Sequence, residues 1–144
     1  MKRTVVVLAA GQGTRMKSPR AKVLHPLMGR TVLEHLLESL KALRTDHTLV
    51  VVGHQAEAVE PLLAPYGATA VLQVPQLGTG HALMACRKAL ETGGPGEILL
   101  VAGDVPLLPV EEVARRWERW PRCRIHPARS RSSSPWCQRE TPGC

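Results

Sequence analysis

The sequence predicts an α/β protein with a doubly wound, Rossmann-like and mostly parallel sheet. Four short apolar runs without alternating polar residues are typical of strands that are buried on both faces. These runs alternate with segments of helical periodicity, and such βαβ units with right-handed crossovers form parallel sheets. Ligands of these sheets bind beyond the carboxyl ends of the strands, so the loops at those ends are the first candidates for function.

The expected strands and helices alternate along the chain. The run RTVVVLA at 3–9 predicts the first strand, and leucines at helical spacing predict a helix over 31–44. The other strands are expected at 47–52, 68–74 and 97–102, separated by helices over 55–67 and 79–91 that end at Gly and Pro residues. A last helix is expected over 110–120, started by a proline.

The net charge of +7 is concentrated in the C-terminal segment. Residues 1–114 carry 11 basic and 10 acidic side chains, whereas residues 115–144 carry 8 and 2. After Trp120 the periodic apolar pattern ends and Arg, Ser, Pro and Cys dominate, so residues 121–144 cannot build a core. This segment can be interpreted as a disordered functional tail or as translation in a shifted reading frame. We expect no specific nucleic-acid partner, because interleaved aromatic residues and a recognisable binding module are missing.

The N-terminal apolar run is too short for a secretory signal, and no run approaches the roughly 18 residues of a membrane-spanning helix. The four cysteines form no CxxC pair, which predicts free thiols. We therefore expect a soluble cytoplasmic protein without a membrane partner. A homo-oligomer stays open, because a parallel sheet of so few strands leaves an apolar edge uncovered.

A glycine-rich loop follows the first strand. Gly11 and Gly13 permit the tight turn that brings backbone N–H groups against a phosphate. Neither the dinucleotide fingerprint, which would need a third glycine at Met16, nor a Walker loop is present. Arg15 and Lys22 are candidate cations for a triphosphate, because phosphoryl chemistry depends mainly on positioning and charge neutralisation. The alternative for both is a solvated loop cation.

The fourth predicted strand ends in Gly103-Asp104. A carboxylate at this position can hold Mg²⁺, which prefers oxygen ligands and usually retains oxygens of a substrate phosphate. The alternative is an aspartate that caps the following turn.

The segment after the third predicted strand carries Gln73, Gln76, Gly78 and Thr79. A glutamine amide offers a donor and an acceptor together, which matches the edge of a uracil ring. Gly78 admits a flat ring close to the backbone, and the following helix N-terminus favours anions. Thr79 can also act as an ordinary N-cap. The six histidines show no metal-ligand spacing, and we expect structural roles for them.

Three segments together carry a resemblance to a known family: LAAGQGTRMKSPRAKVLHPLMGRTVLEHLL, VLQVPQLGTGHA and GDVPLL. They resemble the bacterial bifunctional N-acetylglucosamine-1-phosphate uridyltransferase/glucosamine-1-phosphate acetyltransferases, over residues 3–118. The resemblance implies a nucleotide-diphospho-sugar transferase fold and transfer of UMP from UTP to N-acetylglucosamine 1-phosphate. Pyrophosphate is released in this reaction, Mg²⁺ is the cofactor, and the product serves peptidoglycan and lipopolysaccharide synthesis.

The resemblance also implies roles for individual residues. Arg15 and Lys22 match the catalytic, phosphate-neutralising cations, and Asp104 matches the magnesium ligand. The nucleotide-binding positions are Leu8, Ala9, Ala10, Gly11, Gly13, Lys22, Gln73, Gln76, Gly78, Thr79 and Gly103.

Two departures from the family limit what the resemblance implies. The sugar-contacting segments and a second metal ligand of the family have no counterpart after Trp120, and the hexapeptide repeats of the acetyltransferase domain are missing. We therefore expect residues 1–120 to be the N-terminal, nucleotide-binding part of a truncated nucleotidyltransferase domain. A UTP-binding module without catalysis is the alternative, and acetyl transfer is not expected.

Overall fold

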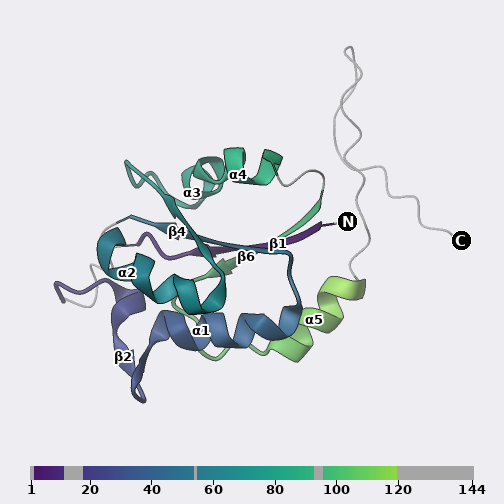
Figure 1. The fold of residues 1–144 in the computed structure, drawn as a ribbon, viewed down its shortest axis with the longest axis horizontal. Helices are drawn as coiled ribbons and strands as arrows, with labels where there is room; N and C mark the ends of the chain where they lie inside the picture. Colours follow the sequence, from purple (N-terminus) through teal and green to yellow (C-terminus); the bar gives the residue numbers. More distant parts are fainter. Residues whose placement is uncertain (1, 12–17, 54, 93–95, 120–144) are drawn as a thin grey trace, which may run out of the picture.

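The computed structural model describes residues 2–11, 18–53, 55–92 and 96–119. Four parallel strands form the main sheet in the order β5-β4-β1-β6 (Figure 1). They are β1 (Lys2–Leu8), β4 (His47–Val52), β5 (Thr69–Leu72) and β6 (Gly96–Ala102). All four predicted strands are present, and the third is shorter than the predicted range of 68–74.

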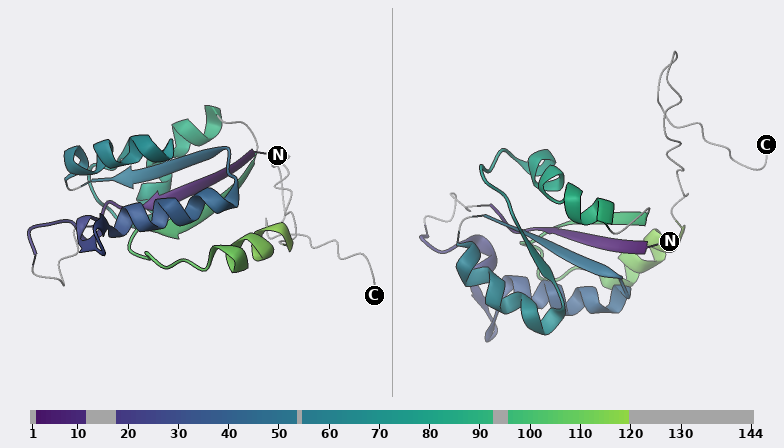
Figure 2. Two further views of the ribbon diagram at one scale, coloured as in Figure 1. Left: turned by 60° about the horizontal axis from the view of Figure 1, so that its bottom comes forward. Right: turned by 45° about the horizontal axis from the view of Figure 1, so that its top comes forward.

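Helices connect the strands and cover both faces of the sheet, which confirms the predicted doubly wound fold. Figures 1 and 2 show α1, α2 and α5 on one face and α3 with α4 on the other. The helical elements are η2 (Lys22–Leu24), α1 (Val32–Leu40), η3 (Lys41–Leu43), α2 (Ala56–Leu63), η4 (Ala64–Tyr66), α3 (Thr79–Ala85), α4 (Arg87–Thr92) and α5 (Val110–Arg119), where η denotes a 3-10 turn.

The strand β1 forms the centre of the core. Its Val6 pairs with Leu49 of β4 on one side and with Leu100 of β6 on the other. The side chains of Val5, Val6 and Val7 are 0% exposed, although they point alternately to the two faces. Because both faces are covered by helices, the strand needs apolar residues at every position, and this explains its unbroken apolar run.

The helix α1 begins with a capping box. The Thr31 hydroxyl accepts the N–H of Glu34, and the Glu34 carboxylate accepts the N–H of Thr31 at 2.7 Å. These hydrogen bonds, first of all the one from the Thr31 backbone, hold the pKa of Glu34 below its ordinary value. The helix then buries one face against β1 and β4, made of Leu33, Leu36, Leu37 and Leu40.

The predicted single helix over 79–91 is divided into α3 and α4 at Cys86. The N–H of Cys86 donates to the carbonyl of Leu83, which tightens the last turn of α3 before α4 begins at Arg87. The Cys86 thiol is free and 0% exposed, and burial raises its pKa. It therefore behaves as a small apolar side chain of the core beneath α3.

A short hairpin was not anticipated from the sequence. The strands β2 (Pro26–Leu27) and β3 (Arg30–Thr31) pair antiparallel around Met28 and Gly29. Both turn residues have positive φ, 47° and 84°, as a two-residue type I′ turn requires. The hairpin leads directly into the capping box of α1.

The strand β6 forms one edge of the sheet. On the face shared with α3 and α4, Ile98 and Leu100 are 49% and 41% exposed. The expected uncovered apolar edge is therefore found among the described residues. The predicted boundary at residue 120 and the interpretation of residues 121–144 concern residues outside the described ranges, and they stay predictions.

Candidate nucleotide-binding site

The backbone after β1 is held between its two neighbouring strands. The N–H of Ala9 donates to the carbonyl of Val51 in β4, and the N–H of Gly103 donates to the carbonyl of Leu8, both at 2.9 Å. Ala9 and Ala10 are buried, whereas Gly11 is exposed. The predicted cradle thus emerges from the sheet at its carboxyl edge on a rigid base.

Gly103 is a point of close approach. A Cβ at this position would lie 2.8 Å from the carbonyl oxygen of Leu8, 3.2 Å from a methyl of Val23 and 3.3 Å from the Cα of Ala9. Only glycine therefore lets the end of β6 pack against β1 and η2. This close packing brings Asp104 to the loop that carries Lys22.

Lys22 and Asp104 form an ion pair at the carboxyl edge of the sheet. The Lys22 Nζ donates to Asp104 Oδ2 at 2.5 Å, and the two side chains are 46% and 36% exposed. The hydrogen bond from Lys22 lowers the pKa of Asp104, against a smaller opposing effect of burial. Lys22 is anchored by its buried neighbours Ala21 and Val23, which are 0% and 3% exposed. The pair presents one cation and one ionised carboxylate to solvent, each accessible to a ligand.

Gln73 lies at the end of β5 and is only 3% exposed. Its backbone N–H donates to Val52, and its side-chain Nε2 donates to the carbonyl of Gly78 at 3.0 Å. The same nitrogen lies 3.2 Å from Nδ1 of His81. The amide group thus fixes the turn that leads into α3, and base recognition by Gln73 stays a prediction.

Gln76 is exposed and lies across the end of β4. A Cβ at Gly53 would meet Nε2 of Gln76 at 2.3 Å and the Cβ of Ala10 at 3.1 Å. The absence of a side chain at Gly53 therefore lets Gln76 reach the end of β1, close to the expected nucleotide cradle.

The start of α3 differs from the alternative in which Thr79 is the N-cap. The N-cap is Gly78, with φ of +96°, and Thr79 is the first helical residue, so the assignment of Thr79 as N-cap is wrong. The positive φ of Gly78 favours glycine. Thr79 and Gly80 are exposed, as Gln76 is.

Gly13 and Arg15 lie in the segment 12–17, outside the described residues. The other predicted site residues lie in two groups at one edge of the sheet. The first group is Leu8, Ala9, Ala10, Gly11, Lys22, Gly103 and Asp104. The second group is Gln73, Gln76, Gly78 and Thr79.

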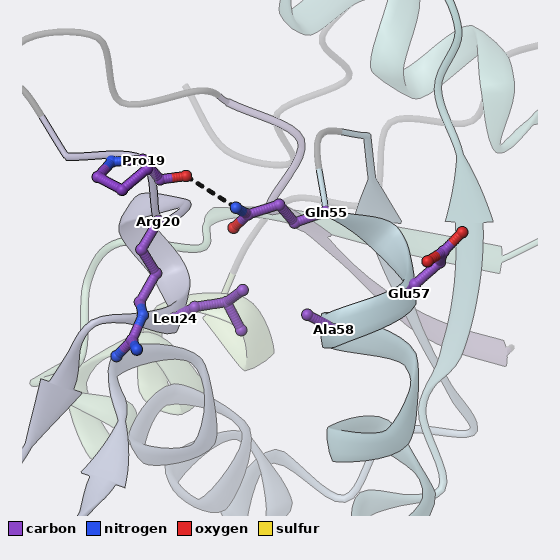
Figure 3. A pocket seen from close by; sticks show the side chains of 6 residues that line it. All are labelled: Pro19, Arg20, Leu24, Gln55, Glu57 and Ala58. Atoms are coloured by element: carbon purple, nitrogen blue, oxygen red, sulfur yellow. Dashed lines mark hydrogen bonds between the residues drawn. The ribbon is translucent and has the colours of Figure 1, made fainter.

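Sequence reasoning missed Gln55. This residue follows β4 after two intervening positions and has a left-handed backbone with φ of 61°. Its Oε1 accepts the N–H of Ala21 at 2.8 Å. Its Nε2 donates to the carbonyl of Pro19 at 2.7 Å, the hydrogen bond drawn in Figure 3. The available signal was its position, because a polar residue directly after a strand's carboxyl end faces the ligand side of the sheet.

An open depression of about 420 Å³ lies beside this contact, between the loop and α2 (Figure 3). Leu24 and Ala58 line it from opposite sides, and Arg20 and Glu57 stand at its rim. The depression shows that, apart from Gln55, little of α2 supports the segment before Lys22.

Two of the described histidines, His35 and His81, have structural partners. His35 Nε2 lies 2.7 Å from the carbonyl of Leu27, and His81 contacts Gln73. Within the described ranges, no cluster of three His, Cys, Asp or Glu side chains is arranged to hold a metal ion. One ionised carboxylate, Asp104, nevertheless fits Mg²⁺, because this ion is commonly held by one or two carboxylates together with substrate phosphates.

A doubly wound parallel sheet with polar groups at its carboxyl edge is typical of proteins that bind ligands at that edge. The chain matches the MobA-like NTP transferase domain over residues 5–137 and belongs to this family. By family and fold it is therefore grouped with the nucleotidyltransferases.

Curated and solved relatives agree with this assignment. The bifunctional protein GlmU of Synechococcus sp. (strain CC9605) is 54% identical over 110 residues, which cover 76% of this chain and 24% of that protein. The chain thus spans about a quarter of the length of this relative. A nucleotidyl transferase from Methanothermobacter is 30% identical with a TM-score of 0.68, covering 82% of this chain and 57% of that one.

Rv0371c from Mycobacterium tuberculosis, solved in complex with manganese, is 28% identical with a TM-score of 0.63. The match covers 82% of this chain and 59% of that chain.

Among the described residues, no helix of this chain is long and apolar enough to cross a membrane.

Proposed function

We propose that the chain transfers UMP from UTP to N-acetylglucosamine 1-phosphate and releases pyrophosphate. The observation that carries this proposal is the Lys22–Asp104 pair at the carboxyl edge of the sheet. A metal–triphosphate complex carries charges of both signs. Its phosphates could replace Asp104 as the partner of the Lys22 cation, and its metal ion could replace Lys22 as the partner of the Asp104 carboxylate. The 54% identity to a GlmU protein favours uridine and an amino-sugar phosphate over other substrates.

In this proposal Lys22 leaves Asp104 when the nucleotide binds and neutralises phosphate charge. The sugar phosphate oxygen is already ionised, so the attack on the α-phosphorus of UTP needs no general base. The P–O bond to the β-phosphate breaks as the new P–O bond forms, and pyrophosphate carries away the electron pair. Arg15 is assigned a parallel role with the leaving phosphates, on its sequence position alone.

Asp104 would hold Mg²⁺ together with phosphate oxygens, and the ion would supply charge neutralisation and orientation of the triphosphate. Before the nucleotide binds, the hydrogen bond from Lys22 lowers the pKa of Asp104, which favours the ionised carboxylate that a metal ion needs. Gln73 and Gln76 are proposed to orient the uracil ring from the opposite side of the site.

The second candidate is a UTP-binding module without catalysis. It is supported by the described residues, in which we assign Lys22, Asp104 and Gln76 to the nucleotide and no side chain to a sugar phosphate. The two candidates share the nucleotide site and differ only in whether a sugar phosphate is accommodated.

Calorimetric titration with UTP, with and without Mg²⁺, tests the nucleotide site. A parallel assay of pyrophosphate release with N-acetylglucosamine 1-phosphate separates the two candidates. Lys22→Ala should weaken UTP binding by on the order of tenfold or more, the loss of one charge-assisted contact to phosphate. The matched control is His47→Ala, an exposed residue at the opposite end of β4, which should leave the affinity unchanged. Equal effects of the two substitutions would contradict the site assignment.

A further inference from the structure

The chain before Lys22 has few contacts of its own, although the two residues flanking Lys22, Ala21 and Val23, are buried in the core. Residues 18–20 are part-buried or exposed, and Pro19 and Arg20 border the open depression against α2. The N-cap of η2, Ala21, has no side-chain hydrogen bond to offer. The path of the chain up to Lys22 therefore depends on contacts from outside residues 18–20.

Gln55 supplies the missing contact with both ends of its amide. Its Oε1 accepts from Ala21, the residue immediately before Lys22, and its Nε2 donates to Pro19. The first bond is 2.8 Å and part-buried, and the second is 2.7 Å. A side chain that bonds an N–H and a C=O two residues apart restrains the segment in two directions, as a strand pairing would.

Gln55 is itself held rigidly. It forms the N-cap of α2, and its backbone carbonyl accepts from Ala58 and Val59 of the first turn. Two residues earlier, Gly53 lies against Gln76. The turn between β4 and α2 therefore contacts both parts of the candidate site. Gln55 bonds the chain just before Lys22, and Gly53 lies beside Gln76.

We infer that Gln55 is a positioning residue, which holds the Pro19–Ala21 segment so that the Lys22 ammonium stays at the carboxyl edge of the sheet, against Asp104. Its role in nucleotide binding rests on the function proposed above. The placement of Lys22 against Asp104 does not, and it can be measured without a nucleotide.

The left-handed backbone of Gln55 suggests two informative substitutions. Gln55→Gly removes the amide and adopts the same positive φ without strain, so α2 keeps its start. Gln55→Glu keeps the length and the acceptor for Ala21, but it cannot donate to Pro19. The matched control is Glu60→Ala, an exposed position on the same helix.

The first readout is the contact between Lys22 and Asp104, followed in the full chain without nucleotide by the NMR coupling across the hydrogen bond from the Lys22 ammonium to the Asp104 carboxylate. In the wild type this coupling should be present, because Lys22 Nζ donates to Asp104 Oδ2. In Gln55→Gly the coupling should be lost, and in Gln55→Glu it should be reduced. A Gln55→Gly coupling identical to the wild type, with the fold intact by circular dichroism, would overturn the inference.

The second readout is the affinity for UTP with Mg²⁺. We expect Gln55→Gly to weaken binding by on the order of tenfold, the equivalent of one or two lost hydrogen bonds, while Glu60→Ala has no effect. Loss of the Lys22–Asp104 coupling with unchanged UTP affinity would overturn the role of Gln55 in nucleotide binding. Absence of UTP binding in the wild type would refute the proposed function instead, and the coupling would still decide whether Gln55 positions Lys22.

Discussion

The close approach at Gly103 makes a quantitative prediction about stability. In Gly103→Ala the new methyl would lie 2.8 Å from the carbonyl oxygen of Leu8, well inside van der Waals contact. The clashing atom belongs to the backbone of the central strand, so it cannot rotate away as a side chain can. The end of β6 must move instead, and the hydrogen bond from the Gly103 N–H to Leu8 lengthens or breaks.

The cost follows from these two effects. Overpacking by one methyl in a rigid core costs about 1 to 3 kcal/mol, and loss of one buried hydrogen bond costs about 1 kcal/mol more. We therefore expect Gly103→Ala to lower the free energy of unfolding by about 2 to 4 kcal/mol. Against a typical total of about 5 to 15 kcal/mol this is a large fraction, and it corresponds to a fall in Tm of roughly 8 to 15 °C.

The assay is urea and thermal unfolding followed by circular dichroism. The matched control is Gly80→Ala in α3, where an added Cβ meets nothing within 4 Å. This substitution should be neutral or stabilise the helix by up to about 1 kcal/mol. Because Gly103→Ala should lower the free energy of unfolding and Gly80→Ala should not, the comparison separates the effect of packing from that of the Gly→Ala change itself. A Gly103→Ala protein as stable as the wild type would refute the packing argument and the position of Asp104 that depends on it.

Two further predictions concern the capping box and the sheet edge. Glu34→Ala should lower stability at neutral pH by about 1 kcal/mol, because the Thr31 N–H loses its acceptor. Since the pKa of Glu34 is lowered by folding, its contribution is fully present above its ordinary pKa and is lost as the pH falls through the folded value. Leu100→Lys, at a 41% exposed position on the edge strand, should reduce concentration-dependent association in analytical ultracentrifugation without loss of fold.

Each of these predictions has an outcome that contradicts it. A stability difference for Glu34→Ala that stays constant into strong acid would show that the carboxylate is not what caps α1. For the edge strand, the neighbouring Leu99 is half-buried among the residues that contact α5, so Leu99→Lys should destabilise the fold. Association that is insensitive to Leu100→Lys would mean that another surface is responsible.

Much of the fold could be predicted because its signals are local. The unbroken apolar run of β1 and the leucine spacing of α1 report burial directly, and the Thr31-to-Glu34 spacing is that of a capping box. The break at Cys86 and the hairpin at Met28 were not predicted, because each depends on a few backbone hydrogen bonds that hydrophobic periodicity does not encode. Gly29 was the available signal for the hairpin, since a type I′ turn needs positive φ at both central positions.

The candidate site, like the fold, was predicted only in part. Lys22 and Asp104 were predicted as separate ligand contacts, from a loop and from a strand end, but their mutual contact spans 82 residues of sequence. Gln55 escaped notice because its importance lies in the Ala21 and Pro19 backbone that it bonds, 34 and 36 residues away. Sequence patterns report which side chains can do chemistry, whereas the contacts that position them come from parts of the chain that are distant in sequence.

The amino-acid sequence by itself determined the α/β class, the alternation of strands and helices, and the edge of the sheet at which we expect a ligand to bind. These properties follow from hydrophobic periodicity and from the polarity of parallel strands, both of which act over a few residues. Only the tertiary structure decided that β6 lies next to β1, because several strand orders bury the same apolar residues equally well. That neighbourhood, made possible by the missing side chain of Gly103, is what brings Asp104 to Lys22.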